Sequence, residues 1–179
     1  MSIIISTPKG DVTIRAATPD DATALYALRL EALSLHPEVF AADYTMTAAE
    51  GAEAWAEKIT EYSSSQSSYI SIVLGSEMLV GMAGLDRGHW PKTRHIGALW
   101  GVYVKPEWRR YSIGERLVKS CIDWAKENGI AVVTLGVNIT DIPAFRCYSK
   151  CGLTLYGIEP RAIYHQGKYY DEILMARVL

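Results

Sequence analysis

The sequence lacks a long apolar run, and its few cysteines are odd in number. The longest apolar run, from Gly97 to Val104, ends at Lys105, whereas a membrane-spanning helix needs roughly 20 apolar residues. The N-terminus also lacks the cationic and apolar regions of a secretory signal. Three cysteines are too few for a disulfide framework. We therefore expect a cytoplasmic protein without a transmembrane segment, in which the cysteines are reduced.

The sequence also has no excess of positive charge. Its 18 basic and 20 acidic residues give a net charge of −2, which argues against nucleic acid as a partner. Cys147 and Cys151 share a predicted helix face, but a zinc ion would need two more ligands and the four histidines show no metal-ligand spacing, so we expect no metal site. A length of 179 residues with 49% hydrophobic residues predicts one compact domain over residues 1–179.

The first third of the chain predicts a strand and two helices. Residues 12–16 alternate apolar and polar side chains, and Thr18-Pro19 then begins a helix that should end near His36-Pro37. A second helix should run from Thr47 to about Tyr62. The apolar stripe of the first helix consists of Ala22, Leu25, Leu28, Ala32 and Leu35.

The remaining sequence alternates strands with helices. Apolar runs on both sides of Gly75-Ser76-Glu77 predict a hairpin, and a third strand follows at about 96–104. Helical spacing from Ile113 ends at Asn128-Gly129, and Asp141 should cap a short helix that ends before Gly152. Further strands are predicted at 132–137, about 153–158 and about 169–178. This order predicts an α/β protein whose mixed sheet carries helices on its faces.

The turn before the third predicted helix has the properties of an anion site. Residues 105–119 contain five basic and two acidic side chains, a local charge of +3. The amides at a helix N-terminus have no partner within the helix, and the helix dipole is positive there. The turn has neither the Lys-Ser/Thr of a Walker loop nor the three glycines of a dinucleotide fingerprint. It therefore predicts a phosphate ligand without nucleotide hydrolysis or hydride transfer.

Two segments together resemble the GNAT superfamily of acyl-coenzyme A N-acyltransferases. The first is Arg109-x-x-Ser112-x-Gly114 after a strand, and the second is Ala144-x-x-x-Tyr148-x-x-x-Gly152-Leu153 after a strand and a polar break. Both stand in the order and spacing of that family, and the resemblance covers nearly the whole chain. It implies a three-layer αβα fold with a mostly antiparallel sheet.

The sequence departs from the family pattern at three positions. Ser112 stands where a glycine is usual, which matters if that backbone needs a positive φ. Asp141 replaces a frequent asparagine and brings a negative charge near the cofactor arm, and Leu153 replaces an aromatic residue. The first two departures bear on cofactor affinity.

The resemblance implies acetyl transfer from acetyl-CoA to a primary amine, directly within a ternary complex. Tyr148 matches the tyrosine that protonates the departing thiolate, although a half-buried packing role is its alternative. The strand before the turn should bind the pantetheine and the thioester carbonyl through its amides. The implied cofactor residues are Val102, Tyr103, Val104, Arg109, Arg110, Tyr111, Ser112, Ile113, Gly114, Glu115, Asp141, Ala144 and Tyr148.

The acceptor is less defined by the sequence. Residues 18–61 contain nine acidic and two basic side chains, which would attract a cationic amine or simply form the solvated faces of two helices. The family places its acceptor site beside these helices and the connection between them. The expected acceptor contacts are Glu38, Phe40, Asp43, Tyr44 and Trp100.

A second function remains open from the sequence. A protein of this family that has lost catalysis would be an acyl-CoA-binding sensor or interaction module, and the retained Tyr148 favours the enzyme. The expected partner is a small-molecule or peptide amine, with no nucleic acid and no membrane. Apolar residues of the last strands are typical either of a homodimer surface or of residues that cover the sheet: Tyr164, Tyr169, Tyr170, Ile173 and Leu174.

Overall fold

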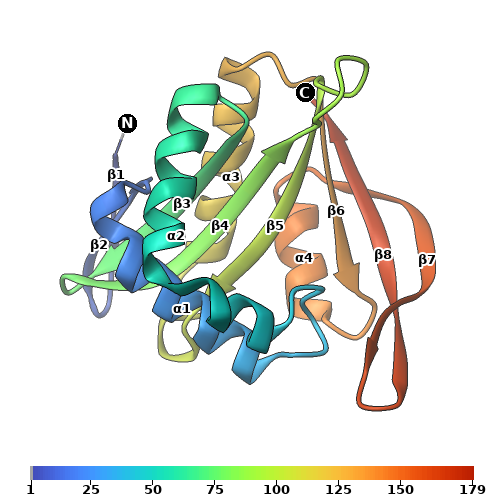
Figure 1. Ribbon diagram of the computed structural model, residues 1–179, viewed down its shortest axis with the longest axis horizontal. Helices are drawn as coiled ribbons and strands as arrows, with labels where there is room; N and C mark the ends of the chain where they lie inside the picture. Colours follow the sequence, from blue (N-terminus) through green and yellow to red (C-terminus); the bar gives the residue numbers. More distant parts are fainter. Residues whose placement is uncertain (1) are drawn as a thin grey trace.

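The computed structural model describes residues 2–179 and contains one eight-stranded sheet with helices on both faces (Figure 1). The strand order is β1-β2-β3-β4-β5-β6-β8-β7. The strands are β1 (Ile3–Thr7), β2 (Gly10–Ala16), β3 (Ser68–Gly75), β4 (Met78–Arg87), β5 (Ile96–Val104), β6 (Val132–Asn138), β7 (Thr154–His165) and β8 (Lys168–Val178). The helices are α1 (Ala22–Leu35), α2 (Tyr44–Ser65), α3 (Ile113–Glu127) and α4 (Ile142–Lys150).

Two separate hydrophobic cores hold the three layers together. On one face, Leu25 and Leu28 of α1 and Trp55 of α2 pack against the sheet. On the other face, α3 buries Leu117 and Val118 among strand residues, and α4 adds Tyr148 to the same core. The predicted three-layer αβα architecture with a mostly antiparallel sheet is therefore confirmed.

The sheet is split between β5 and β6, the one parallel pair among the described residues 2–179. Pairing begins at Ile96 with Val132 and ends at Ala98 with Thr134, and residues 2–179 contain no further pair of these strands. A register shift between Met82 and Gly84 places an extra residue in β5, where Gly101 has a φ of +60°. Such a bulge bends the strand and increases its twist. Strand β5 thus diverges from β6 after Ala98.

The structure corrects several local predictions. Strand β1 pairs with β2 but was not predicted, because its three consecutive isoleucines do not alternate with polar residues. Helix α2 is longer than predicted and contains a kink at Gly51, where φ is +77°. Leu35 is exposed at the end of α1, and Ile173 of the expected dimer surface belongs to the core. No helix within residues 2–179 is long and apolar enough to cross a membrane.

Candidate active site

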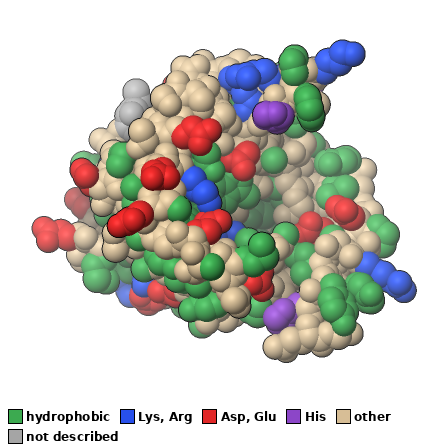
Figure 2. Space-filling model, viewed as in Figure 1, with side chains coloured by type: hydrophobic (Ala, Val, Ile, Leu, Met, Phe, Trp, Pro, Cys, Tyr) green, Lys and Arg blue, Asp and Glu red, His purple; other side chains and the backbone are tan. Residues whose placement is uncertain are grey.

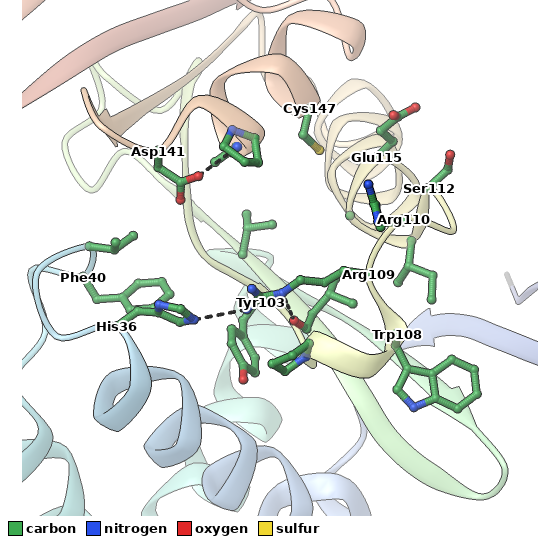
Figure 3. Close-up of a pocket in the computed structure, with 18 of the residues that line it drawn as sticks. His36, Phe40, Tyr103, Trp108, Arg109, Arg110, Ser112, Glu115, Asp141 and Cys147 are labelled. Carbon is green, nitrogen blue, oxygen red and sulfur yellow. Dashed lines mark hydrogen bonds between the residues drawn. The ribbon is translucent and has the colours of Figure 1, made fainter. Parts of the chain in front are cut away.

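A cavity of about 840 Å³ lies where the end of β5, the start of α3, α4 and the α1–α2 connection meet (Figure 3). All of the expected cofactor residues line it except Tyr111, which packs against the core, and Tyr148. The predicted residues thus come together at one cavity, although they come from distant parts of the chain. Residues that sequence reasoning missed in its wall include His36, Pro106, Thr140, Cys147 and Lys150.

The N-terminus of α3 opens into this cavity with an unusual backbone. Arg110 and Ser112 have φ values of +70° and +57°, in the left-handed region. Ser112 precedes the first helical residue, Ile113, so its conformation sets the direction in which the first-turn amides point. The glycine that is usual in the family at this position would adopt such a φ with less strain. Serine therefore preserves the turn at a cost in backbone energy.

Side-chain contacts fix the turn before α3 in place. The Arg109 guanidinium folds back, donating from Nε to the Val104 carbonyl at 2.9 Å and lying 3.1 Å from Nε2 of His36. The Trp108 indole is buried against Gly75, where any side chain would collide with the ring. Arg109 and Arg110 are both exposed at the wall of the cavity, but among the described residues Arg110 has no such side-chain contact. Of the two arginines, Arg110 is thus the one available for an anionic ligand.

A carboxylate links the end of β5 to α1. Glu31 accepts hydrogen bonds from the Tyr103 hydroxyl at 2.9 Å and from Lys105 Nζ at 2.7 Å. Burial, together with the hydrogen bond to Glu31, raises the pKa of Tyr103 above its ordinary value. Tyr103 therefore stays protonated and acts as a structural link between the strand and the helix.

The break between β6 and α4 is organised by two polar side chains. Asp141 caps α4 by accepting a hydrogen bond from the Ala144 amide at 3.0 Å. Asn138 is buried, accepts from the amide and hydroxyl of Thr140, and donates to the Glu38 carbonyl at 3.0 Å. The hydrogen bond from Asn138 to the Glu38 carbonyl ties the α1–α2 connection to the end of β6. The Asp141 carboxylate thus has a defined capping role beside the cavity.

A smaller cavity of about 350 Å³ occupies the split between β5 and β6. It shares Val102, Asp141 and Ala144 with the larger cavity, so the two adjoin. Tyr148 lines the smaller one and is only 8% exposed. Burial, with additional effects of the Cys147 thiol and the Asp141 carboxylate, raises the pKa of Tyr148 above its ordinary value. The phenol is therefore protonated at neutral pH.

The expected acceptor residues divide into two groups. Glu38 lines the larger cavity, Trp100 the smaller one, and Phe40 both. Asp43 and Tyr44 line neither cavity: Asp43 caps α2 by accepting from the Met46 amide at 2.9 Å, and Tyr44 is exposed. Ala41 and Ala42 still line the smaller cavity, and the chain leaves it only after Ala42 to begin α2, which explains why Asp43 and Tyr44 do not join the site.

Sequence reasoning missed two charged residues of the smaller cavity, Arg29 and Glu172. Arg29 stands on the buried stripe of α1, four residues after Leu25 and three before Ala32. A charged side chain at a core position of an amphipathic helix is unusual, so the sequence alone could have identified Arg29 as a candidate site residue. For Glu172 on β8 no comparable signal exists, because exposed strand positions commonly carry charges.

The surface next to the cavities is acidic on one side. Figure 2 shows acidic side chains gathered over the face that α1 and α2 cover, beside a hollow. Of these helical residues, Glu53, Glu57 and Glu61 are exposed, and Glu50 pairs with Lys58 at 2.8 Å.

Within residues 2–179, no three His, Cys, Asp or Glu side chains lie close enough to hold a metal ion.

Comparison with solved structures defines the class of the fold. A GNAT-family acetyltransferase from Streptococcus pneumoniae superposes with a TM-score of 0.85 at 24% identity, over 94% of this chain and 99% of that one. The putative acetyltransferase yncA from Salmonella typhimurium, solved with its cofactor acetyl-CoA, superposes with a TM-score of 0.77 at 18% identity, over 93% of each chain. The fold is that of the GNAT acetyltransferases.

The sequence places the chain in the family itself. Residues 30–153 match the Acetyltransferase (GNAT) family, so the chain belongs to this family of acetyltransferases. The L-amino acid N-acetyltransferase AaaT of Escherichia coli K12 is 28% identical over 102 residues, which cover 56% of this chain. The match spans 62% of that relative's length. The resemblance read from the two motifs is confirmed.

Proposed function

We propose that the chain transfers the acetyl group of acetyl-CoA to a primary amine, directly within a ternary complex. The observation that carries this proposal is the adjacency of the two cavities, which share Val102, Asp141 and Ala144. One holds the amides of the α3 N-terminus, and the other holds Tyr148. The acceptor amine and the cofactor thus have separate spaces that adjoin.

The larger cavity has the features that a coenzyme A pyrophosphate requires. The first-turn amides of α3 and the exposed Arg110 supply hydrogen-bond donors and positive charge. Gly114 in that turn leaves its amide accessible, and the nearest side-chain atom to a methyl group built there is Cys147 Sγ at 3.5 Å. Residues 110–115 are therefore the proposed pyrophosphate cradle, and Val102 to Val104 of the bulged strand are proposed to hold the pantetheine.

Bound acetyl-CoA would supply the acetyl group as a thioester. The unprotonated amine of the acceptor attacks the thioester carbonyl carbon, the carbon–sulfur bond breaks, and the thiolate leaves with the bonding electron pair. Amides of the diverging part of β5 stabilise the charge that develops on the carbonyl oxygen. The attacking nitrogen loses its extra proton to water, Tyr148 donates its phenolic proton to the thiolate, and the phenolate takes a proton back from water, so that the protons balance.

The test is a panel of amines, polyamines and peptide N-termini, with release of the coenzyme A thiol as readout. We expect thiol release that requires both substrates and gives no acetylated protein in the absence of an amine. Rapid acetylation of the chain itself would contradict direct transfer. Acetyl-CoA binding without turnover of any amine would favour the sensor function instead.

Residues 1–179 are proposed to form one catalytic unit, located in the cytoplasm, without nucleic-acid or membrane partners. A homodimer through β7 and β8 is supported by exposed apolar side chains beside the edge of the sheet, among them Leu155, Tyr156, Ile158, Tyr164 and Tyr169. Light scattering over a concentration series measures whether the chain associates.

A further inference from the structure

The smaller cavity contains a buried guanidinium that lacks a protein counterion. Arg29 is only 7% exposed, and its NH1 atom is buried without a hydrogen-bond partner. The four ion pairs within residues 2–179 do not include it. Burial lowers the pKa of Arg29 to about 10, and the distant charge of Glu50 offsets part of this effect. A buried charge without a partner is costly, so its retention calls for a ligand that compensates it.

The surroundings of Arg29 hold its guanidinium at the wall of the cavity. The group stacks on Phe40, 5.1 Å from the ring centroid, and lies 5.8 Å from the ring of Trp100. On another side is Gly101, the bulge residue of β5, where a Cβ would come within 3.2 Å of the Arg29 NH1 atom. The bulge thus brings this side chain up to the split between β5 and β6.

A second buried donor belongs to the same cavity. The indole Nε1 of Trp100 is also buried without a partner, and its ring lies over Gly84, where any side chain would overlap it. Phe40, Gly101 and Trp100 all line this cavity together with Arg29. Two unpartnered donors, one of them cationic, define a site for an acceptor group with negative charge.

A carboxylate contributes the opposite charge to the cavity wall. Glu172 extends from β8 over Gly136 of β6, and its carboxylate fills the space that a side chain at Gly136 would take. Burial, together with the neighbouring Glu159, raises the pKa of Glu172 above its ordinary value. A protonated amine nearby would compensate this carboxylate, as an anionic group would compensate Arg29.

We propose that the acceptor is a small amine that carries a carboxylate, such as a free amino acid, and that Arg29 with Trp100 Nε1 binds that carboxylate while Glu172 faces the ammonium group before its deprotonation. The proposal rests on the proposed acetyl transfer and adds the class of acceptor. The planar guanidinium matches a carboxylate in a bidentate arrangement. A polyamine fits poorly, because its additional cations would be placed near Arg29.

The test compares L-amino acids with the corresponding amino acid amides, which retain the amine but lack the carboxylate. With wild-type protein we expect kcat/KM to be higher for the amino acids. Arg29→Met keeps a long apolar side chain and should lower kcat/KM for amino acids by roughly 10- to 100-fold, mostly through KM, because a hydrogen bond to a charged group is lost. The preference over the amides should disappear.

Three matched variants separate recognition from packing. Trp100→Phe keeps the ring stacked but removes Nε1, so the preference should weaken to a smaller extent. Arg29→Lys keeps the charge without the planar fork and should retain part of the preference. Lys58→Met removes the other cation of residues 18–61, at an exposed ion pair, and should leave the preference as in the wild type. An equal loss for amino acids and amides in Arg29→Met would overturn the proposal and assign Arg29 to packing.

Calorimetric titration of L-amino acids into the protein in the presence of coenzyme A keeps the test independent of turnover. If no amine is acetylated, the proposed function fails, yet binding of amino acids that Arg29→Met abolishes still supports the carboxylate site. A wild-type protein that binds and acetylates the amides or polyamines better than the amino acids would contradict it.

Discussion

The two adjoining cavities are built in different ways. At the α3 end, the larger one presents backbone amides and exposed side chains, and its shape depends on left-handed residues at Arg110 and Ser112. The smaller one is formed mainly by buried or half-buried side chains from several elements, including Arg29, Trp100 and Tyr148. A backbone site recognises a group that is common to all reactions of a family, whereas a side-chain site is readily changed by substitution. This difference supports the proposed binding of the cofactor in the first cavity and the proposed selection of the acceptor in the second.

The largest effect is expected when the proton donor of the smaller cavity is removed and the larger cavity is left unchanged. Tyr148→Phe keeps the buried ring but deletes the phenolic proton, so single-turnover transfer should fall by roughly 10²–10⁴-fold. Acetyl-CoA affinity should change little, because Tyr148 does not line the larger cavity. Rapid-quench measurements with an accepted amine check the rate, and calorimetry checks the affinity. Tyr62→Phe, at a half-buried tyrosine of α2 that lines neither of these two cavities, is the control; equal rates in all three proteins would remove Tyr148 from the reaction.

The second prediction reverses this pattern by damaging the backbone cradle. Gly114→Pro removes one amide donor from the first turn of α3, at a position where proline is still compatible with a helix. We expect acetyl-CoA affinity to fall roughly 10- to 100-fold, since a hydrogen bond to a charged phosphate is worth about 1.5–3 kcal/mol. Gly114→Ala retains the amide and should bind more tightly than Gly114→Pro. Calorimetric titration that finds the proline variant equal to wild type would contradict the cradle.

The third prediction concerns stability and the cost of the buried cation. In the absence of ligands, Arg29→Met should raise the free energy of unfolding by about 1–3 kcal/mol, because it replaces a desolvated charge with an apolar side chain. Chemical denaturation without coenzyme A or amine measures this change, with Lys58→Met as the exposed control. A loss of stability would mean that stacking on Phe40 and Trp100 outweighs desolvation.

The smallest expected effect is at the turn before α3. Ser112→Gly relieves a left-handed conformation at φ +57° and should stabilise the fold by about 1 kcal/mol or less, since the more flexible unfolded chain offsets part of the gain. Ser112→Ala keeps the strained backbone and lacks the hydroxyl, so it should not share the gain. Thermal unfolding of the three proteins distinguishes backbone strain from a contribution of the side chain.

The contrast between the larger cavity, built by local backbone structure, and the smaller cavity, built by distant side chains, explains what the sequence predicts well. Strand β5, helix α3 and the Asp141 cap of α4 follow from local periodicity and turn chemistry, and the two family motifs locate most of the larger cavity. Residues of the smaller cavity are distant in sequence, and only the fold brings Arg29, Trp100 and Glu172 together. Strand β1 has no alternation, so its pairing with β2 decides its structure.

The end of pairing between β5 and β6 has a consequence for solvent exchange. Beyond Ala98 and Thr134 the strands no longer share a ladder, so β5 amides that face the split are not protected by strand pairing on that side. Their deuterium uptake in the free protein should exceed that of the paired amides at Ile96 to Ala98. A cofactor bound there would supply hydrogen-bond acceptors for these amides, so coenzyme A should slow deuterium uptake in this segment of β5. Protection of this one strand would then report that the cofactor is bound.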